Sequence, residues 1–300
     1  MSEQTVGMEH YTPKKWISVS AINNFCRCPR YYFYCQGCSL DTKLVSAPMT
    51  FGGCVHKALP FAFKGEITNA MAAFCSDWSE DLQDDKRNVM RAKAMFENFY
   101  ETHKEGRSIY IPMEPPKNRA EAVEHNGEFE VPFAVDVELD IPLVGLVDCL
   151  AKHRDTGATC VVEFKTSSQL GGMFLQSFQL SPQALIYALA MKLLTGEDIE
   201  TVFIEGLLVA KVSCNTMVIP LFIKDFYMPE ILKHVQNTYA KIKRCENEEN
   251  FPKNFSGCNS YAMFGSPGYN CPYLPLCATT DKWTDLLDMY VKKEPRLLPY

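Results

Sequence analysis

Two apolar, branched runs occupy the middle of the chain, one from Leu143 to His153 and the other from Thr159 to Lys165. The short stretch between them, Arg154-Asp-Thr-Gly157, has the composition of a turn. Two such runs joined by a turn that contains glycine predict a β-hairpin. Because both runs are apolar along most of their length, we expect the hairpin to lie within a largely buried sheet that other elements cover.

Three charged residues within these apolar strands stand out. Asp148 lies in the first strand, and Glu163 and Lys165 lie in the second. Residues two apart in a strand point to the same face, so Glu163 and Lys165 share one face and Phe164 points to the other. Burying a charge costs free energy unless the charge is paired or bound to a metal ion. The simpler alternative is a structural Glu–Lys pair at a solvated strand end.

These residue types suit the hydrolysis of a phosphodiester. The carboxylates of Asp148 and Glu163 can hold Mg²⁺ or Mn²⁺, which prefer oxygen ligands, and the backbone carbonyl of Phe164 is a further candidate ligand. The metal would polarise the phosphate and help to generate hydroxide. Lys165 would orient the water or stabilise the negative charge that develops. The predicted catalytic residues are therefore Asp148, Glu163 and Lys165.

The hydrophobic periodicity of the remaining chain predicts further helices and strands around this hairpin. Ser20 can cap the first helix, and Pro29 would bend it. The order of the elements predicts an α/β or α+β fold with a small central sheet flanked by helices. Helices are expected over residues 18–34, 51–64, 66–104, 174–194 and 226–247 and near 283–291, and strands over residues 129–140, 201–211 and 216–222.

The composition excludes some classes of protein. The chain has 47% hydrophobic and 22% charged residues and a net charge of −6, which argues against a protein that coats nucleic acid non-specifically. No apolar run approaches the ~20 residues of a membrane helix. The first residues also lack the apolar core of a secretory signal. We therefore expect a cytoplasmic protein with no membrane partner.

Thirteen cysteines are many for a chain in a reducing compartment, where clustered thiols point to metal or iron–sulfur ligation before disulfides. Cys258, Cys271 and Cys277 lie in a tail rich in glycine, proline and aromatic residues. A metal would supply the constraint that such a loop lacks. The other reading, unligated thiols that pack as small hydrophobes, fits a second set better. That set is Cys54, Cys75, Cys149, Cys160, Cys214 and Cys245.

Three more motifs accompany the carboxylate–lysine set. They are Cys28-Pro-Arg30-Tyr31-Tyr32, Gly53-Cys-Val-His56 and Gln183-Ala-Leu-Ile-Tyr187. Together and in this order, the motifs resemble those of the RecB-type and CRISPR-associated (Cas) exonuclease-type branch of the PD-(D/E)xK nucleases. The resemblance covers residues 28 to 277, which is nearly the whole chain.

The resemblance implies an α/β fold with a restriction-endonuclease-like core and a mixed central sheet. It implies that the enzyme is a Mg²⁺- or Mn²⁺-dependent DNA exonuclease that acts on single strands or DNA ends. It makes His56 a metal ligand, which favours Mn²⁺ over Mg²⁺. It also places Gln183 and Tyr187, which share one helical face, beside the active site. Without it, His56 is a structural histidine and Tyr187 is a core residue.

The resemblance further implies a [4Fe–4S] cluster held by one N-terminal and three C-terminal cysteines, which are Cys28, Cys258, Cys271 and Cys277. The family tail has the form C-x2-C-x5-C. Here the x5 spacing is kept, but Cys258 precedes Cys271 by 13 residues, which makes Cys258 the least secure of the four ligands. Zinc is the rival metal. The alternative cysteine ligands are Cys26, Cys35 and Cys38.

Four parts of the chain follow from these assignments. Residues 1–15 are expected to be flexible, and residues 16–50 and 248–300 to form the iron–sulfur subdomain. Residues 51–126 are expected to be a helical region, and residues 127–247 the nuclease core.

The resemblance implies DNA as the substrate. Contacts to DNA are expected from Arg27, Arg30, Tyr31 and Tyr32, because arginine binds phosphate and aromatic rings stack on exposed bases. Alternatively, the tyrosines pack against the cluster.

The chain has no P-loop, so any motor is supplied by a partner. The chain is expected to be a stand-alone nuclease or a subunit that works with a helicase, a recombinase or a CRISPR adaptation partner, in recombination, repair, phage replication or spacer processing. The sequence is compatible with both a monomer and a homo-oligomer. The competing hypotheses are a catalytically inactive iron–sulfur or zinc DNA-binding module and an unrelated metal enzyme.

Overall fold

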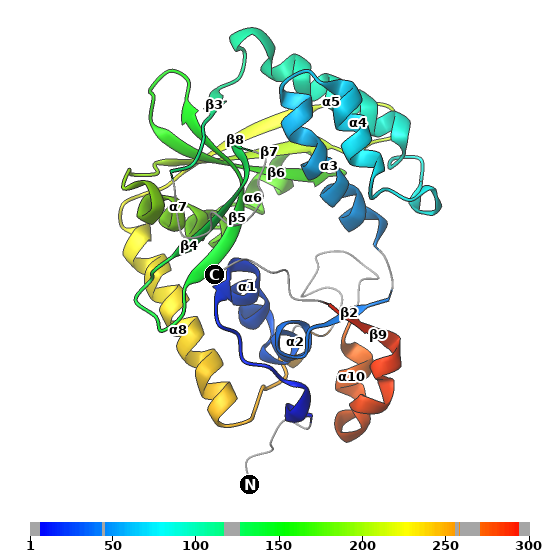
Figure 1. Ribbon diagram of the computed structural model, residues 1–300, viewed down its shortest axis with the longest axis vertical. Coiled ribbons are helices and arrows are strands. Elements are labelled where there is room, and N and C mark those ends of the chain that lie inside the picture. The colour runs from blue at the N-terminus through cyan, green and yellow to red at the C-terminus, as the bar shows by residue number, and fades with distance from the viewer. Residues whose placement is uncertain (1–6, 44–45, 117–126, 256–257, 259–270, 294–300) are drawn as a thin grey trace. The chain divides into compact units, whose positions relative to one another are not determined.

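The computed structural model describes residues 7–43, 46–116, 127–255, 258 and 271–293 (Figure 1). Their contacts divide the chain into two compact units. The first unit combines described residues within Met1–Leu44, Val135–Gly145 and Pro229–Pro299, and the second those within Val45–Ala134 and Leu146–Met228. Each unit is described by itself below.

A mixed sheet organises the second unit. Its order is β5 (Leu143–His153), β6 (Thr159–Ser167), β7 (Thr201–Leu208) and β8 (Thr216–Phe222). The β6–β7 pair is parallel, whereas β5–β6 and β7–β8 are antiparallel. Two further strands, β3 (Tyr110–Pro112) and β4 (Phe129–Val135), pair with β5.

The predicted hairpin is confirmed as β5 and β6. Their ladder runs from Lys152 opposite Thr159 to Cys149 opposite Val162. Both strands are buried over most of their length, as their apolar composition requires. The sheet is central and mixed, which confirms the predicted fold class.

Helices cover both faces of this sheet. On one face lie α3 (Ala47–Phe63), α4 (Ile67–Cys75) and α5 (Val89–His103). The side chain of Asn88 caps α5 by accepting a hydrogen bond from the backbone of Arg91. Phe164 points to this side and packs against Phe99 of α5. The other face is covered by α7 (Pro182–Thr195). The largest fully buried rings of this core are Tyr110, Phe51, Phe74, Phe96, Phe99, Phe129, Phe164 and Phe203.

The second unit also contains three short helical segments. These are η3 (Glu80–Leu82), η4 (Lys104–Gly106) and α6 (Gly172–Gln176).

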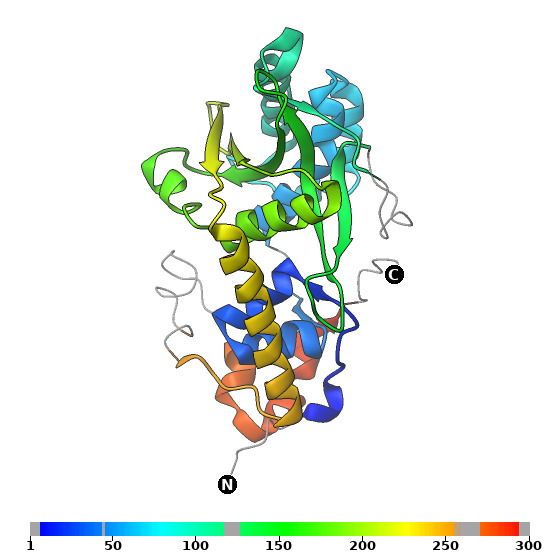
Figure 2. The same cartoon turned by 90° about the vertical axis from the view of Figure 1, so that its left-hand side faces the viewer.

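The first unit is built from short helices and one long one. Its N-terminal part comprises η1 (Met8–His10), β1 (Ile17–Ser18), α1 (Val19–Arg27), α2 (Pro29–Tyr32), the π-helical turn η2 (Phe33–Gly37) and β2 (Leu40–Thr42). Its C-terminal part comprises most of α8 (Tyr227–Asn247), the long helix in Figure 2, with α10 (Leu274–Ala278), η6 (Thr280–Met289) and β9 (Tyr290–Lys292).

Strand pairs and aromatic packing join these parts of the first unit. β2 pairs with β9, and β1 pairs with the first residues of β5. Phe33, Tyr34 and Trp283 form a buried aromatic core between the two ends of the chain.

Several element boundaries differ from the prediction. Ser18, rather than Ser20, caps the first helix by accepting a hydrogen bond from the backbone of Ala21 at 3.1 Å. That helix ends at Arg27, because Cys28 is extended before Pro29.

The prediction of one long helix over residues 174–194 is wrong. The chain forms α6 and α7 with a break at residues 177–181. Pro182 begins α7, a position that proline tolerates, whereas a proline inside a helix removes a hydrogen bond and clashes with the preceding turn.

The C-terminal helix is a 3₁₀ helix that ends at Met289 and leads into β9. Within the described part of the chain, no helix is long and apolar enough to span a membrane.

Candidate active site

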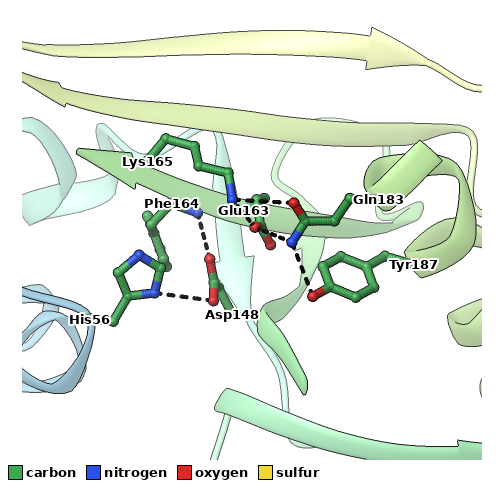
Figure 3. A network of polar contacts seen from close by, with 7 residues as sticks. All are labelled: His56, Asp148, Glu163, Phe164, Lys165, Gln183 and Tyr187. Atoms are coloured by element: carbon green, nitrogen blue, oxygen red, sulfur yellow. Dashed lines mark hydrogen bonds and ion pairs between the residues drawn. The ribbon is translucent and has the colours of Figure 1, made fainter. Parts of the chain in front are cut away.

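Asp148 lies where β5 and β6 separate. The last residues paired across the hairpin are Cys149 and Val162. One residue further along, the side chain of Asp148 replaces the backbone as the partner of β6, since its Oδ2 accepts a hydrogen bond from the backbone N–H of Phe164 at 2.8 Å. The splayed strands therefore hold a carboxylate between them (Figure 3).

His56 approaches the same carboxylate from α3. Its Nδ1 lies 3.1 Å from Oδ1 of Asp148. The helix can come this close because Gly52 has no side chain, and a Cβ there would lie 3.2 Å from Oγ1 of Thr166 on β6. A small residue at the point of contact thus brings the imidazole to the sheet.

Glu163 and Lys165 lie on the other side of Asp148 and contact α7 (Figure 3). The Nζ of Lys165 contacts Oε1 of Glu163 and donates to Oε1 of Gln183 at 3.4 Å. The Nε2 of Gln183 donates to Oε1 of Glu163 at 2.8 Å and to the hydroxyl of Tyr187 at 3.1 Å. Gln183 therefore contacts Glu163 and Lys165 directly, whereas Tyr187 reaches them through Gln183. Tyr187 is also a core residue with 7% exposure.

Burial and mutual charge shift the protonation of this group. Burial, reinforced by the charge of Asp148, raises the pKa of Glu163 to about 8. Burial also acts to raise the pKa of Asp148, but His56 outweighs it and the pKa is lowered. For His56, burial acts to lower the pKa, but Asp148 prevails and the pKa is raised. A further positive charge beside Glu163 would favour its ionised form.

The donor set fits a divalent metal by its chemistry. It contains one imidazole and two carboxylates, and Oε2 of Glu163 is buried without a hydrogen-bond partner among the described residues. In the described ranges, no three His, Cys, Asp or Glu side chains converge as a metal-binding group. His56 and Asp148 instead bond to each other, and Lys165 contacts Glu163. An unsatisfied buried carboxylate oxygen is what a hard cation would complete.

The predicted cluster cysteines lie in the first unit. Cys28 and Cys271 are buried, and Cys258 and Cys277 are half-buried. Burial raises the pKa of Cys258, Cys271 and Cys277, and each is raised further by the charge of Cys28. The four thiols therefore lie in one electrostatic neighbourhood. Residues 259–270, between two of them, lie outside the described residues.

The alternative cysteines have other surroundings. Cys26 is exposed and contacts His234 and Thr238 of α8 at 3.8 and 3.6 Å. Cys35 accepts a hydrogen bond from Asn24 at 3.6 Å. Burial raises the pKa of Cys38, and the strongest charge acting on it is that of Lys292. None of these three thiols is among the groups that most shift Cys258, Cys271 or Cys277.

The residues predicted to contact DNA also lie in the first unit. Tyr32 is 3% exposed, and its ring packs on Phe25 and Phe251, which leaves no face open to a base. Tyr31 is half-buried and packs edge-on against Tyr273. The structure therefore favours the packing alternative for Tyr32.

The two arginines of this set are half-buried. The Nε of Arg30 donates to the backbone carbonyl of Phe251 at 2.7 Å. The guanidinium of Arg27 lies 5.3 Å from the centre of the Tyr31 ring. Both side chains therefore already have contacts within the unit.

Sequence reasoning missed the residues that seat α6 and α7 on the sheet. Leu170 and Phe174 pack over Gly206 of β7, where a Cβ would lie 2.6 and 2.7 Å from them. Ser181-Pro182 is the signal that divides the expected helix, and Gly171-Gly172 marks the start of the segment before it.

Comparisons with known proteins agree with this geometry. The family model of the PD-(D/E)XK nuclease superfamily matches residues 16–278. None of the curated proteins compared matches the chain.

Two solved structures match the chain over most of its length. A candidate exonuclease from Eubacterium rectale shares 17% identity with a TM-score of 0.52, covering 93% of this chain and 98% of that one. SSO0001 shares 13% identity with a TM-score of 0.34, covering 88% and 89%. The first likeness shows a common fold, and the second is too low to support an argument.

Proposed function

The chain belongs to the PD-(D/E)XK nuclease superfamily, and from this premise we propose that it is a metal-dependent DNA exonuclease of the RecB-type and Cas-exonuclease-type branch. One observation carries the proposal. Asp148, Glu163 and Lys165 meet where the hairpin opens, and a buried oxygen of Glu163 has no partner in the described part of the protein.

Mg²⁺ or Mn²⁺ is the cofactor that these residues would hold. The proposed ligands are the carboxylates of Asp148 and Glu163, the imidazole of His56 and the backbone carbonyl of Phe164. When bound, the ion would polarise the scissile phosphate and make a nearby water more acidic. Because imidazole suits Mn²⁺ better than Mg²⁺, activity with Mn²⁺ should be at least as strong as activity with Mg²⁺.

The protein's own side chains divide the remaining work. Lys165 supplies a fixed positive charge beside Glu163, where it can stabilise the negative charge that develops on the phosphate as water attacks and the P–O bond breaks. Gln183 binds Glu163 and Lys165 at once and so fixes both. Tyr187 holds Gln183 from the core. Side chains locked in this way lose little entropy in the transition state.

A [4Fe–4S] cluster held by Cys28, Cys258, Cys271 and Cys277 is part of the same proposal. Thiolate is the ligand such clusters use. The four cysteines come from opposite ends of the sequence, yet the charge of Cys28 raises the pKa of Cys258, Cys271 and Cys277. This electrostatic influence supports grouping them as ligands of one cluster. The cluster would define a subdomain of residues 16–50 and 248–300, beside a helical region (51–126) and the nuclease core (127–247).

DNA ends or single strands are the proposed substrate, by analogy with the branch. Arg27, Arg30 and Tyr31 remain proposed DNA contacts, whereas the buried Tyr32 is proposed to support the cluster subdomain. A helicase, recombinase or CRISPR adaptation partner would deliver the strand.

The proposal is tested by cleavage of end-labelled DNA. Protein purified without oxygen is mixed with single- or double-stranded DNA and with Mg²⁺, Mn²⁺ or a chelator. We expect metal-dependent cleavage from an end, and the order of the labelled products gives the polarity. A folded, iron-loaded protein that leaves both DNAs intact with either metal would instead support the inactive DNA-binding module.

A further inference from the structure

The chain between the catalytic strand and the site helix is uncharged. No Asp, Glu, Lys, Arg or His occurs from Thr166 to Met191, although 22% of the whole chain is charged. Within this stretch, residues Ser168 to Leu180, here called the neutral segment, run between β6 and α7 and include α6. Burial of α7 explains why the residues of that helix up to Met191 carry no charge. It does not explain the neutral segment, which is largely exposed.

Apolar side chains of the neutral segment face solvent. The side chains of Met173, Leu175 and Leu180 are 76%, 38% and 64% exposed. The exposed polar residues between them are amides and hydroxyls. They are Ser168, Gln169, Gln176, Ser177 and Gln179. The surface therefore offers apolar contacts and amide hydrogen bonds but no charge of either sign.

The neutral segment is anchored on the catalytic face of the sheet. Phe174 and Leu170 pack over Gly206 of β7. Gly206 is the registered neighbour of Lys165 on the parallel strand β6, and registered neighbours point to the same face. The exposed side chains are thus tethered one strand away from the amine of Lys165.

The backbone of this region is also strained. Leu180 has a φ of 54°, a left-handed conformation that is unfavourable for leucine. It holds a mostly exposed leucine immediately before Ser181 and Pro182, where α7 begins. Strain of this kind at an exposed residue that leads into site residues is typical of a binding element.

We propose that the neutral segment binds the bases of an unpaired DNA strand as its backbone enters the site. This inference rests on the proposed nuclease function. Phosphates are bound by cationic side chains, and the neutral segment has none. Bases instead offer apolar faces and hydrogen-bonding edges. Methionine and leucine side chains insert against base faces, and glutamine amides bond to base edges. Lys165 and the metal ligands would meet the phosphate, and the neutral segment would meet the neighbouring bases.

The test separates base contacts from backbone contacts. In a Glu163→Gln background, which prevents cleavage, fluorescence anisotropy gives the affinity for a labelled oligothymidylate and for an abasic oligomer of the same length. We expect the base-bearing strand to bind about tenfold more tightly, which corresponds to ~1.4 kcal/mol. Adding Met173→Ser, Leu175→Ser and Leu180→Ser should remove this preference and leave the affinity for the abasic strand unchanged.

Two further variants make the result specific. Val212→Ser with Phe222→Ser changes exposed apolar residues of the same unit outside the neutral segment, with 87% and 66% exposure, and should leave the base preference intact. Gly206→Ala should reduce the preference, because the new Cβ displaces Phe174 and Leu170.

Several outcomes would overturn the inference. The first is equal affinity of the Glu163→Gln protein for both oligomers while the wild type still cleaves DNA. That result would remove the base contacts but leave the proposed nuclease function standing. Another is a triple variant that keeps the base preference but sediments as a smaller species than the parent, which would make the neutral segment a contact between copies of this chain. A wild type that neither binds nor cleaves DNA would remove the proposed function itself.

Discussion

The candidate active site and the cysteine group are positioned in different ways. Asp148, Glu163 and Lys165 lie on two strands joined by a short turn, and backbone pairing fixes their separation. Cys28 and Cys258 are 230 positions apart in the sequence, and 13 positions separate Cys258 from Cys271. Local register therefore places the first set, whereas the second depends on closing a long loop.

This difference teaches what each region needs from a metal. The strands and helices around Asp148 fold by burying apolar surface, so the site should be formed before the ion binds. The predicted cluster cysteines come from distant parts of the sequence, so their grouping should depend on the ligand. Metal removal should then disable the first region without unfolding it and should loosen the second.

The largest expected effect is loss of cleavage on removing the charge of Lys165. Lys165→Met should lower the rate by a factor of about 10³ or more, because a positive charge beside the reacting phosphate is removed from a water-poor site. Initial rates on end-labelled DNA measure this. Lys152→Met, on β5 of the same hairpin, removes a surface ion pair with Glu197 and is the matched control. Equal rates in the two variants would refute the assigned role.

The next largest effect concerns the cysteine group. Cys277→Ser should lower the iron content and reduce Tm by about 5 °C or more, because a lost ligand releases the tail. Iron analysis and thermal unfolding monitored by circular dichroism give both values. Cys75→Ser, at an exposed thiol of the second unit, should change neither. Unchanged iron in Cys277→Ser would remove this residue from the ligand set.

A buried polar network behind the catalytic strands should contribute less. The hydroxyl of Tyr110 donates to Oε2 of Glu205 at 2.6 Å, and Nε2 of His103 lies 2.7 Å from Oε1. Tyr110→Phe leaves one buried oxygen unpaired and should cost about 1–3 kcal/mol of unfolding free energy.

Urea denaturation measures this cost. Tyr100→Phe on α5 is the control, since no hydrogen bond of its hydroxyl occurs in the described ranges. Equal losses of stability would show that the network adds nothing.

The last effect, small within any one pH unit, is a pH dependence of the stability of the metal-free protein. The pKa of Glu163 is raised to about 8 from the usual 4.5. Below pH 4.5 both states are protonated and its stabilising effect is complete. Between pH 4.5 and 8 the folded state keeps a proton that the unfolded chain has released, so stability falls as pH rises, by at most about 1.4 kcal/mol per unit.

Glu163→Gln should flatten this slope. Urea unfolding in chelator at pH 5, 6, 7 and 8 compares the two proteins. Parallel slopes would mean that the carboxyl group is not protonated in the folded state.

The sequence predicted the part of the molecule that backbone periodicity controls. β5 and β8 have the predicted bounds, and the shared face of Glu163 and Lys165 follows from the period of a strand. The position of Gln183 beside the active site was implied only by resemblance, because its contact with Glu163 depends on how α7 packs on the sheet.

Packing decides the features that the sequence did not predict. Nothing local indicates that Phe174 lies over Gly206 or that Tyr32 is enclosed by Phe25 and Phe251. The break before α7 was readable from Pro182, but the apolar run around it favoured one continuous helix. Tertiary contacts across the chain cannot be read from local periodicity.

Binding of Mn²⁺ tests the central claim most directly. Electron paramagnetic resonance counts free Mn²⁺ as it is added to the wild type, to Glu163→Gln and to Asp148→Asn. We predict that the wild type binds Mn²⁺ and that either substitution weakens the affinity by about 100-fold or more, with the fold unchanged by circular dichroism. Equal binding by all three proteins would contradict a metal site built from the two carboxylates.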